Sequence, residues 1–206
     1  GTNTSFAHSL TDAPAGSDVV WMLRTIPSIY SIYLRDASGN LILDGNGDKI
    51  YDYGNDRVGW SGWNVLGDAK YNTYKTYVDN ISNRDYIEVT FMPTLKFRST
   101  LSIDYYLTSY HGYTNADYGY MAGRGAAYKS YDRNVATTLT NVLNYNQSFG
   151  KHTVGITLGE ENFSRHVTGM SGGKEDFPFS GLTELSSAAT MTSLSSYIDD
   201  YRLLSF

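Results

Sequence analysis

The chain has 206 residues, a length that fits one domain or part of a larger one. Its 16 Lys and Arg residues are outnumbered by 21 Asp and Glu residues, and a net charge of −5 argues against nucleic-acid binding, which normally needs a basic patch. Cysteine is absent, which excludes disulfides, thiolate metal sites and cysteine nucleophiles.

The composition favours an all-β fold. The chain holds 19 Tyr and 20 Gly, and charged residues make up 18% against about 25% in ordinary soluble domains. Tyr, Thr and Val favour strands, while Gly, Asn and Ser favour turns. Such a polar, tyrosine-rich sequence fits either a soluble β-protein or a transmembrane β-barrel, in which lipid-facing and lumen-facing residues alternate. The N-terminus has no basic and apolar leader, so we expect a removed leader or a start inside a longer chain.

The first 80 residues show little periodicity. Short strand-like runs over 28–35 and 41–43 flank turn-forming Ser-Gly-Asn and Asp-Gly-Asn-Gly sequences. An irregular stretch of this length is too long for a connection inside a compact domain. We therefore expect a long extracellular loop over residues 11–75, as large outer-membrane barrels carry on one side.

Four segments with alternating apolar and polar residues follow within residues 76–162. They cover 85–92, 95–107, 135–149 and 152–162. Pro93-Thr94 separates the first two segments, and the Gly150 turn separates the last two. Because these connections are short, we predict that 85–92 pairs with 95–107 and that 135–148 pairs with 152–162, as antiparallel hairpins.

Each alternating segment has one apolar side. These apolar residues would face lipid in a transmembrane barrel, or a second sheet in a soluble sandwich, and periodicity alone leaves both folds open. They include Leu95, Phe97, Leu101, Ile103, Val135, Leu139, Leu143, Val154, Ile156 and Leu158.

The connections alternate between short and long. A second extracellular loop is expected over 163–200, with a short helix suggested by the spacing of Leu182, Leu185, Ala189 and Leu194. Residues 202–206 are expected to start a further strand. Short turns at one end and long loops at the other are typical of an antiparallel transmembrane β-barrel.

An acidic turn in the first loop has some features of a calcium site. Asp44, Asn46, Asp48 and Asp52 place oxygen ligands at alternate positions, as the first part of a calcium loop does. The turn lacks the glycine expected at its sixth position and the glutamate expected at its twelfth. The alternative is an Asp- and Gly-rich β-turn without a metal.

Two tryptophans of the same loop are candidates for ligand binding. Trp60 and Trp63 lie in the sequence Gly-Trp-Ser-Gly-Trp. Exposed indole rings can stack on sugars, because binding pockets often combine aromatic rings with a few polar groups. The alternative is that both rings pack the loop onto its neighbours, since indoles are highly buried on average.

The sequence offers no enzymatic site. Glu160 and Glu161 are adjacent in a predicted strand, so their side chains point to opposite faces and do not form a catalytic pair. The four histidines have no metal-ligand spacing; they are His8, His111, His152 and His166. No phosphate loop and no hydrolase triad pattern occurs in the sequence. We therefore expect a non-catalytic protein without a cofactor, calcium excepted.

Several segments resemble SusC/RagA-type TonB-linked outer-membrane proteins. The first loop carries Ile26-Pro27-Ser28-Ile29-Tyr30, Tyr33-Leu34-Arg35-Asp36 and Tyr51-Asp52-Tyr53-Gly54, which are similar to the long middle loop of that family. Tyr86-Ile87-Glu88-Val89 and Phe149-Gly150-Lys151-His152 resemble parts of its next barrel hairpins. The likeness extends over nearly the whole chain in order and spacing.

This resemblance implies that residues 1–206 are part of one barrel of about 22 strands. Residues 76–162 would be barrel hairpins, whereas 11–75 and 163–200 would be extracellular loops. The family imports glycans or peptides across the bacterial outer membrane, with a SusD-type surface lipoprotein as lid and energy from TonB. No plug domain is recognised in the chain. A soluble β-sandwich that binds carbohydrate is the alternative.

Overall fold

A computed structural model describes residues 1–12, 23–54 and 57–206. It is a six-stranded antiparallel sheet whose strands are neighbours in sequence order. The strands are β1 (Thr2–Asp12), β2 (Thr73–Met92), β3 (Leu95–Thr114), β4 (Ala126–Phe149), β5 (His152–Glu175) and β6 (Thr190–Ser205). The sheet is open, with β1 and β6 at its edges.

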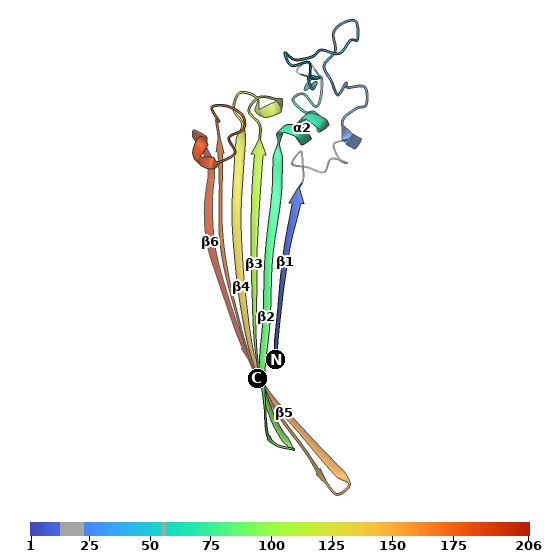
Figure 1. The fold of residues 1–206 in the computed structure, drawn as a ribbon. Coiled ribbons are helices and arrows are strands. Elements are labelled where there is room, and N and C mark those ends of the chain that lie inside the picture. Colours follow the sequence, from blue (N-terminus) through green and yellow to red (C-terminus); the bar gives the residue numbers. More distant parts are fainter. Residues whose placement is uncertain (13–22, 55–56) are drawn as a thin grey trace.

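Short helices occur only in the connections of the described chain. They include α2 (Val65–Tyr71) and the 3₁₀ helices η1 (Gly119–Met121) and η2 (Leu185–Ser187), and residues 23–25 are also helical. None of the helices in the described ranges has the length and apolar character needed to cross a membrane. The tight turns of the β2–β3 and β4–β5 hairpins lie at one end of the sheet, and α2, η1 and η2 lie at the other (Figure 1).

Both predicted hairpins are confirmed. In β2 and β3, Val89 pairs with Phe97 and the pairing continues to Thr73 and Tyr113. β4 and β5 pair without interruption from the turn to the far end of the strands. The strands are longer than predicted, because β2 begins at Thr73 rather than at residue 85 and β4 begins at Ala126 rather than at residue 135.

Three regions contain regular structure that the sequence pattern did not indicate, or less of it than expected. The first 80 residues show little periodicity, but β1 occupies Thr2–Asp12 and pairs with β2. Strands occupy part of residues 163–200, since β5 continues to Glu175 and β6 begins at Thr190. The helix suggested around Leu182–Leu194 is the single turn η2, and Leu194 belongs to β6. Ser, Thr and Gly dominate these strand ends, so the apolar alternation that marks the other strands is missing there.

The register divides the sheet into two chemically different faces. Directly paired residues lie on the same face, and alternate residues of a strand lie on opposite faces. We call the first face the apolar face; Phe6 pairs there with Ile81, Leu101 with Leu139, and Leu143 with Leu158. The opposite, polar face carries mainly hydroxyl, amide, charged and glycine residues, among them Lys96, Arg98, Ser102, Asp104, Thr138, Asn144, Thr153, Gly155, Thr157 and Gly159.

The sheet is a single layer. In the described part of the chain, no second sheet covers the apolar face, and each strand contacts its neighbours in the sheet. Ile156 is 50% exposed and Leu158 is 63% exposed. A small buried cluster lies at the loop end, where the β5–β6 connection packs on the sheet: Tyr113, Ala127, Phe177 and Ala188.

Candidate functional site

The first loop, which we define as residues 23–72, begins with three short paired segments. Tyr33 pairs with Tyr51, Arg35 with Leu41 and Leu43 with Lys49. The two turns between these segments are each organised by an aspartate that accepts hydrogen bonds from backbone N–H groups two and four residues later. Such aspartate-centred turns explain the ordered structure of an aperiodic sequence. The same bonds, those from Asn40 above all, hold the pKa of Asp36 below its ordinary value.

The candidate calcium ligands fall into two groups. Asp44, Asn46 and Asp48 share the second turn, in which Asp44 Oδ1 accepts from the N–H groups of Asn46 at 2.9 Å and Asp48 at 2.8 Å. Asp52 lies outside this turn and forms an ion pair with Arg57 at 2.9 Å. Residues 1–12, 23–54 and 57–206 contain no group of three or more His, Asp or Glu side chains suited to a metal ion. The contacts of Asp44 are those of a structural turn.

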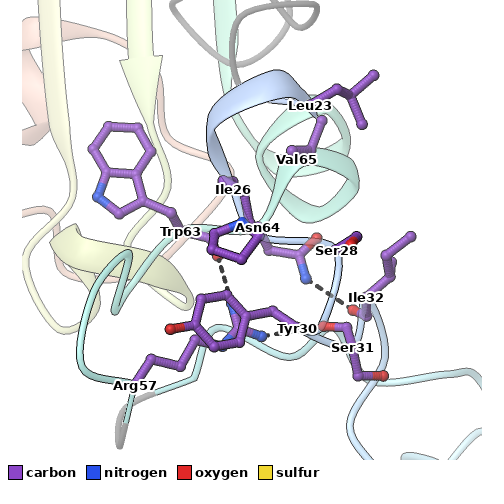
Figure 2. A pocket seen from close by; sticks show the side chains of 11 residues that line it. Leu23, Ile26, Ser28, Tyr30, Ser31, Ile32, Arg57, Trp63, Asn64 and Val65 are labelled. Atoms are coloured by element: carbon purple, nitrogen blue, oxygen red, sulfur yellow. Dashed lines mark hydrogen bonds between the residues drawn. The ribbon is translucent and has the colours of Figure 1, made fainter.

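Arg57 is the centre of the first loop. Its guanidinium donates to the carbonyl oxygens of Ser31 at 3.1 Å and Asp52 at 3.0 Å, and it lies 4.5 Å from the centre of the Tyr30 ring. Figure 2 shows the Tyr30 ring over the Arg57 side chain. The Arg57 side chain is only 8% exposed. One planar cation therefore joins residues 30–31 to the segment that contains Asp52.

An apolar pocket of about 270 Å³ lies beside Arg57. Its wall is mainly aliphatic and aromatic, with Ser28, Ser31 and Asn64 as polar members (Figure 2). The remaining lining residues are Leu23, Ile26, Pro27, Tyr30, Ile32, Trp63 and Val65.

The two candidate tryptophans have different environments. Trp63 lines the apolar pocket, and its indole stacks on Tyr120 of the β3–β4 connection with ring centres 5.1 Å apart. Trp60 has a positive φ of 62°, a backbone conformation that few non-glycine residues adopt. Both side chains are half-buried. Trp63 therefore packs the first loop onto the β3–β4 connection, because Tyr120 covers one face of its ring.

A larger cleft of about 950 Å³ opens between the first loop and the β3–β4 connection. Tyr51, Tyr53 and Tyr118 form part of its wall. Tyr71, behind the wall, joins two of them: its ring lies 5.8 Å from that of Tyr51 and 4.6 Å from that of Tyr118, and the Tyr118 ring lies 6.0 Å from that of Tyr53. Asp52, Asp117 and Arg57 supply charge. The cleft thus combines aromatic rings with carboxylates at the loop end of the sheet, the pattern of a ligand-binding surface.

Four buried polar residues join the walls of this cleft, and we call them the polar junction: Asn64, Asp68, Asn72 and Asn115. Asn64 caps α2 by accepting from the Gly67 N–H at 2.9 Å. The Asn64 side-chain amide also donates to the carbonyl oxygens of Ile32 and Asp52. This cap therefore fixes the helix to the rest of the first loop.

Asn72 and Asn115 connect α2 to the β3–β4 connection. Asn72 Oδ1 accepts from the Asn115 backbone N–H at 3.0 Å and from its side-chain amide at 2.7 Å. Asn115 Oδ1 in turn accepts from the backbone N–H groups of Asp117 and Tyr118. The position of Tyr118 in the cleft wall therefore depends on this pair of asparagines.

Asp68 is the charged member of the polar junction and is 3% exposed. Burial raises its pKa to about 6, and hydrogen bonding to the Asn64 N–H and the Asn72 amide offsets only part of that rise. The Tyr53 hydroxyl lies beside the Asp68 carboxyl and also lowers its pKa, although it forms no hydrogen bond of normal geometry.

Sequence reasoning missed the polar junction. An asparagine directly before a helical segment is a cap signal, and Asn64 could have been found in that way. The pairing of Asn72 with Asn115 joins residues 43 positions apart, and no local pattern predicts it.

The two adjacent glutamates and the four histidines do not come together in one site. Glu160 pairs with Asn141 on the apolar face, whereas Glu161 pairs with Thr140 on the polar face, so the two carboxylates do point apart. His8 and His166 each bind an aspartate of the neighbouring strand at 2.6 Å. His111 contacts the Tyr131 hydroxyl, and His152 begins β5.

Comparisons with known proteins give a clear result for the fold. No family model matches the chain, and no curated protein matches its sequence. A solved structure of the RagAB peptide transporter matches with a TM-score of 0.68 and 15% identity, over 98% of this chain. The closed-closed state of the RagAB peptide importer matches equally, and its open-open state matches with a TM-score of 0.66 and 18% identity over 78% of this chain.

The chain spans 23% of the length of two of these solved structures and 18% of the third. The likeness covers the strands and their connections. It shows that the six-stranded antiparallel sheet and its long connections have a RagA-like fold.

Proposed function

We propose that this chain is part of the wall and outer loops of a SusC/RagA-type importer in the bacterial outer membrane. The importer would carry peptides or glycans and would have no catalytic role. The observation that supports this most directly is the apolar face: a row of large aliphatic side chains, exposed on a single-layer sheet whose other face is polar. Lipid on one side and a water-filled lumen on the other account for that division.

The ends of the sheet support the same proposal. Turns of two residues lie at one end, and the connections with α2, η1 and η2 lie at the other. In outer-membrane barrels the short turns face the periplasm and the long loops face outward. On this basis the first loop, the β3–β4 connection and residues 176–189 would be extracellular, and the cleft between the first two would contact the substrate.

The partners follow from the proposal. RagAB, whose structures resemble this fold, is a peptide transporter. A surface lipoprotein of the SusD type would dock on the extracellular loops, TonB would supply energy, and outer-membrane lipid would cover the apolar face. Trp63 would contribute one edge of the substrate surface, since it lines a pocket next to the cleft. Trp60 and the Asp44 turn would shape the loop around it.

A soluble carbohydrate-binding sandwich is less well supported. That fold buries the apolar face of one sheet against a second sheet. In the described part of the chain the apolar face has no such cover, and its large side chains are exposed. Trp63 also has one ring face stacked on Tyr120, which reduces the platform available to a sugar.

A nitroxide scan along β5 tests the proposal. The chain has no cysteine, so single cysteines at positions 153–158 are unique within it. In outer-membrane vesicles we expect spin labels at Val154, Ile156 and Leu158 to be accessible to dissolved oxygen, which partitions into lipid. Labels at Thr153 and Thr157 are expected to be accessible to a water-soluble nickel chelate. Protection of the labels at Val154, Ile156 and Leu158 from both reagents would support the sandwich instead.

A further inference from the structure

Asp68 lies where three segments meet. It belongs to α2, its carboxyl faces Tyr53 of the first loop, and Asn72 links it to Asn115 of the β3–β4 connection. None of the ion pairs within residues 1–12, 23–54 and 57–206 includes Asp68. A carboxylate that is 3% exposed and has no cation beside it is costly to keep charged.

The other ionisable groups at this site are tyrosines. Tyr53 lies beside Asp68, Tyr74 is near enough to be affected by its charge, and Tyr71 and Tyr118 face Tyr53. Lys70 of α2 lies over the Tyr71 ring at 5.3 Å. Asp117 acts on Tyr118. An ordinary tyrosine loses its proton near pH 10, and burial raises the pKa of Tyr53 and Tyr118 further. Asp68 is therefore the group among these that changes charge near neutral pH.

We infer that protonation of Asp68 tightens the contact between the first loop and the β3–β4 connection, so that the cleft between them responds to pH. The walls of the cleft respond in this way whatever ligand the cleft takes. Tyr53 and Tyr118 both line the cleft; the Tyr53 hydroxyl lies beside Asp68, and Asn115 accepts a hydrogen bond from the Tyr118 backbone N–H. A charged Asp68 would loosen the junction, and a neutral Asp68 would close it.

The sign follows from the two pKa values of Asp68. The packed junction raises the pKa from 3.8 to about 6, so the packed state binds the proton more strongly than the open state does. The extra stability is complete below about pH 3.8 and is lost as the pH rises through about 6. Over that interval the ratio of closed to open junction is expected to fall on the order of a hundredfold.

Hydrogen exchange followed by mass spectrometry tests this in the intact protein. We expect the amides of residues 64–72 and 115–118 to lose protection as the pH rises from about 4 to about 7, after correction for intrinsic exchange. Asp68→Asn is close in shape to the neutral acid, and its protection is expected to be independent of pH. Asp48→Asn, an exposed position of the same loop, is the matched control and is expected to behave as the wild type.

A second variant keeps the test decisive if Asp68→Asn fails to fold. Tyr53→Phe removes a hydroxyl that lowers the pKa of Asp68, so the loss of protection is expected to move to higher pH. A purely structural role would change protection equally at every pH. The inference is overturned if the wild type shows no loss in this interval, if Asp68→Asn retains it, or if Tyr53→Phe leaves its midpoint unchanged.

Discussion

Leu101 of β3 and Leu139 of β4 are directly paired in the middle of the sheet, yet they are 38% and 39% exposed. A central cross-strand pair of leucines is normally covered by another layer, because each buried side chain contributes roughly 1.5–3 kcal/mol. Here the pair continues along the apolar face to Phe97 and Leu143. The fold leaves this area to be covered by something other than the described chain, and lipid is the cover that we propose.

Arginine at position 139 is expected to block assembly in the membrane. Leu139→Arg puts a charge on the apolar face, at a cost of about 2–4 kcal/mol near the bilayer midplane. Thr138→Arg is the matched control, since the neighbouring residue lies on the polar face. Folded protein in outer-membrane fractions, measured by heat-modifiable migration in gels, is expected to be lost only for Leu139→Arg. Equal losses would contradict the assignment of the two faces.

Epitope tags test which end of the sheet faces outward. Gly47, Gly150 and Gly181 all have positive φ, with open space around them, so each is a suitable insertion point. We expect antibody to reach tags at Gly47 and Gly181 on intact cells, and a tag at Gly150 to be hidden. Gly173 is unsuitable, because it is paired with Ser193 inside the sheet. An accessible Gly150 together with a hidden Gly47 would reverse the proposed topology.

Replacing Arg57 by lysine is expected to open the first loop, although the substitution keeps the positive charge. A lysine ammonium cannot bind the carbonyls of Ser31 and Asp52 and stack on Tyr30 at the same time. We expect a loss of about 1–3 kcal/mol in local stability, visible as faster proteolysis between residues 23 and 72. The same exchange at exposed Arg24 serves as the control and is expected to leave proteolysis unchanged.

The β5–β6 connection is expected to respond to acid in the opposite sense to the polar junction. Lys129 Nζ donates to both carboxylate oxygens of Glu184 at 2.6 Å and holds the pKa of Glu184 below its ordinary 4.5. The stabilisation is present above that pH and is lost as the pH falls through the lowered pKa. It amounts to less than about 1 kcal/mol, because Glu184 is largely exposed.

A nitroxide at Gly181 reports on this connection. Its spectrum is expected to show greater mobility at about pH 3 than at about pH 6 in the wild type. Lys129→Met removes the cation, so the label is expected to be mobile at both values. If the variant kept the pH response of the wild type, the Lys129–Glu184 pair would not be its source.

The sequence predicted the centre of the sheet well. Between Leu95 and Leu158, aliphatic residues alternate with polar ones because one side of each strand is apolar in the fold. The turns at Pro93 and Gly150 then determined which segments pair. Local chemistry was sufficient for these elements.

The edges and the site needed information that local patterns do not hold. In β1 only Phe6 and Leu10 mark the apolar face, and in β6 a serine- and threonine-rich start hides the strand. Nothing in the sequence around Asp68 indicates that it is buried, because its burial depends on Tyr53 and the β3–β4 connection, which lie elsewhere in the chain. Trp63 likewise acquires its partner Tyr120 from a connection far along the chain.

The unbroken pairing of β4 with β5 has a consequence for how this protein can change its length. The ladder runs from Ala126 and Glu175 to Phe149 and His152, whereas the β2–β3 and β5–β6 ladders each contain an irregular step near an end. If one residue were added in the middle of β4, every β4 side chain on one side of the insertion would move from the apolar face to the polar face or the reverse. Added residues can therefore be accommodated in pairs, or at the rims, where irregular steps already absorb them.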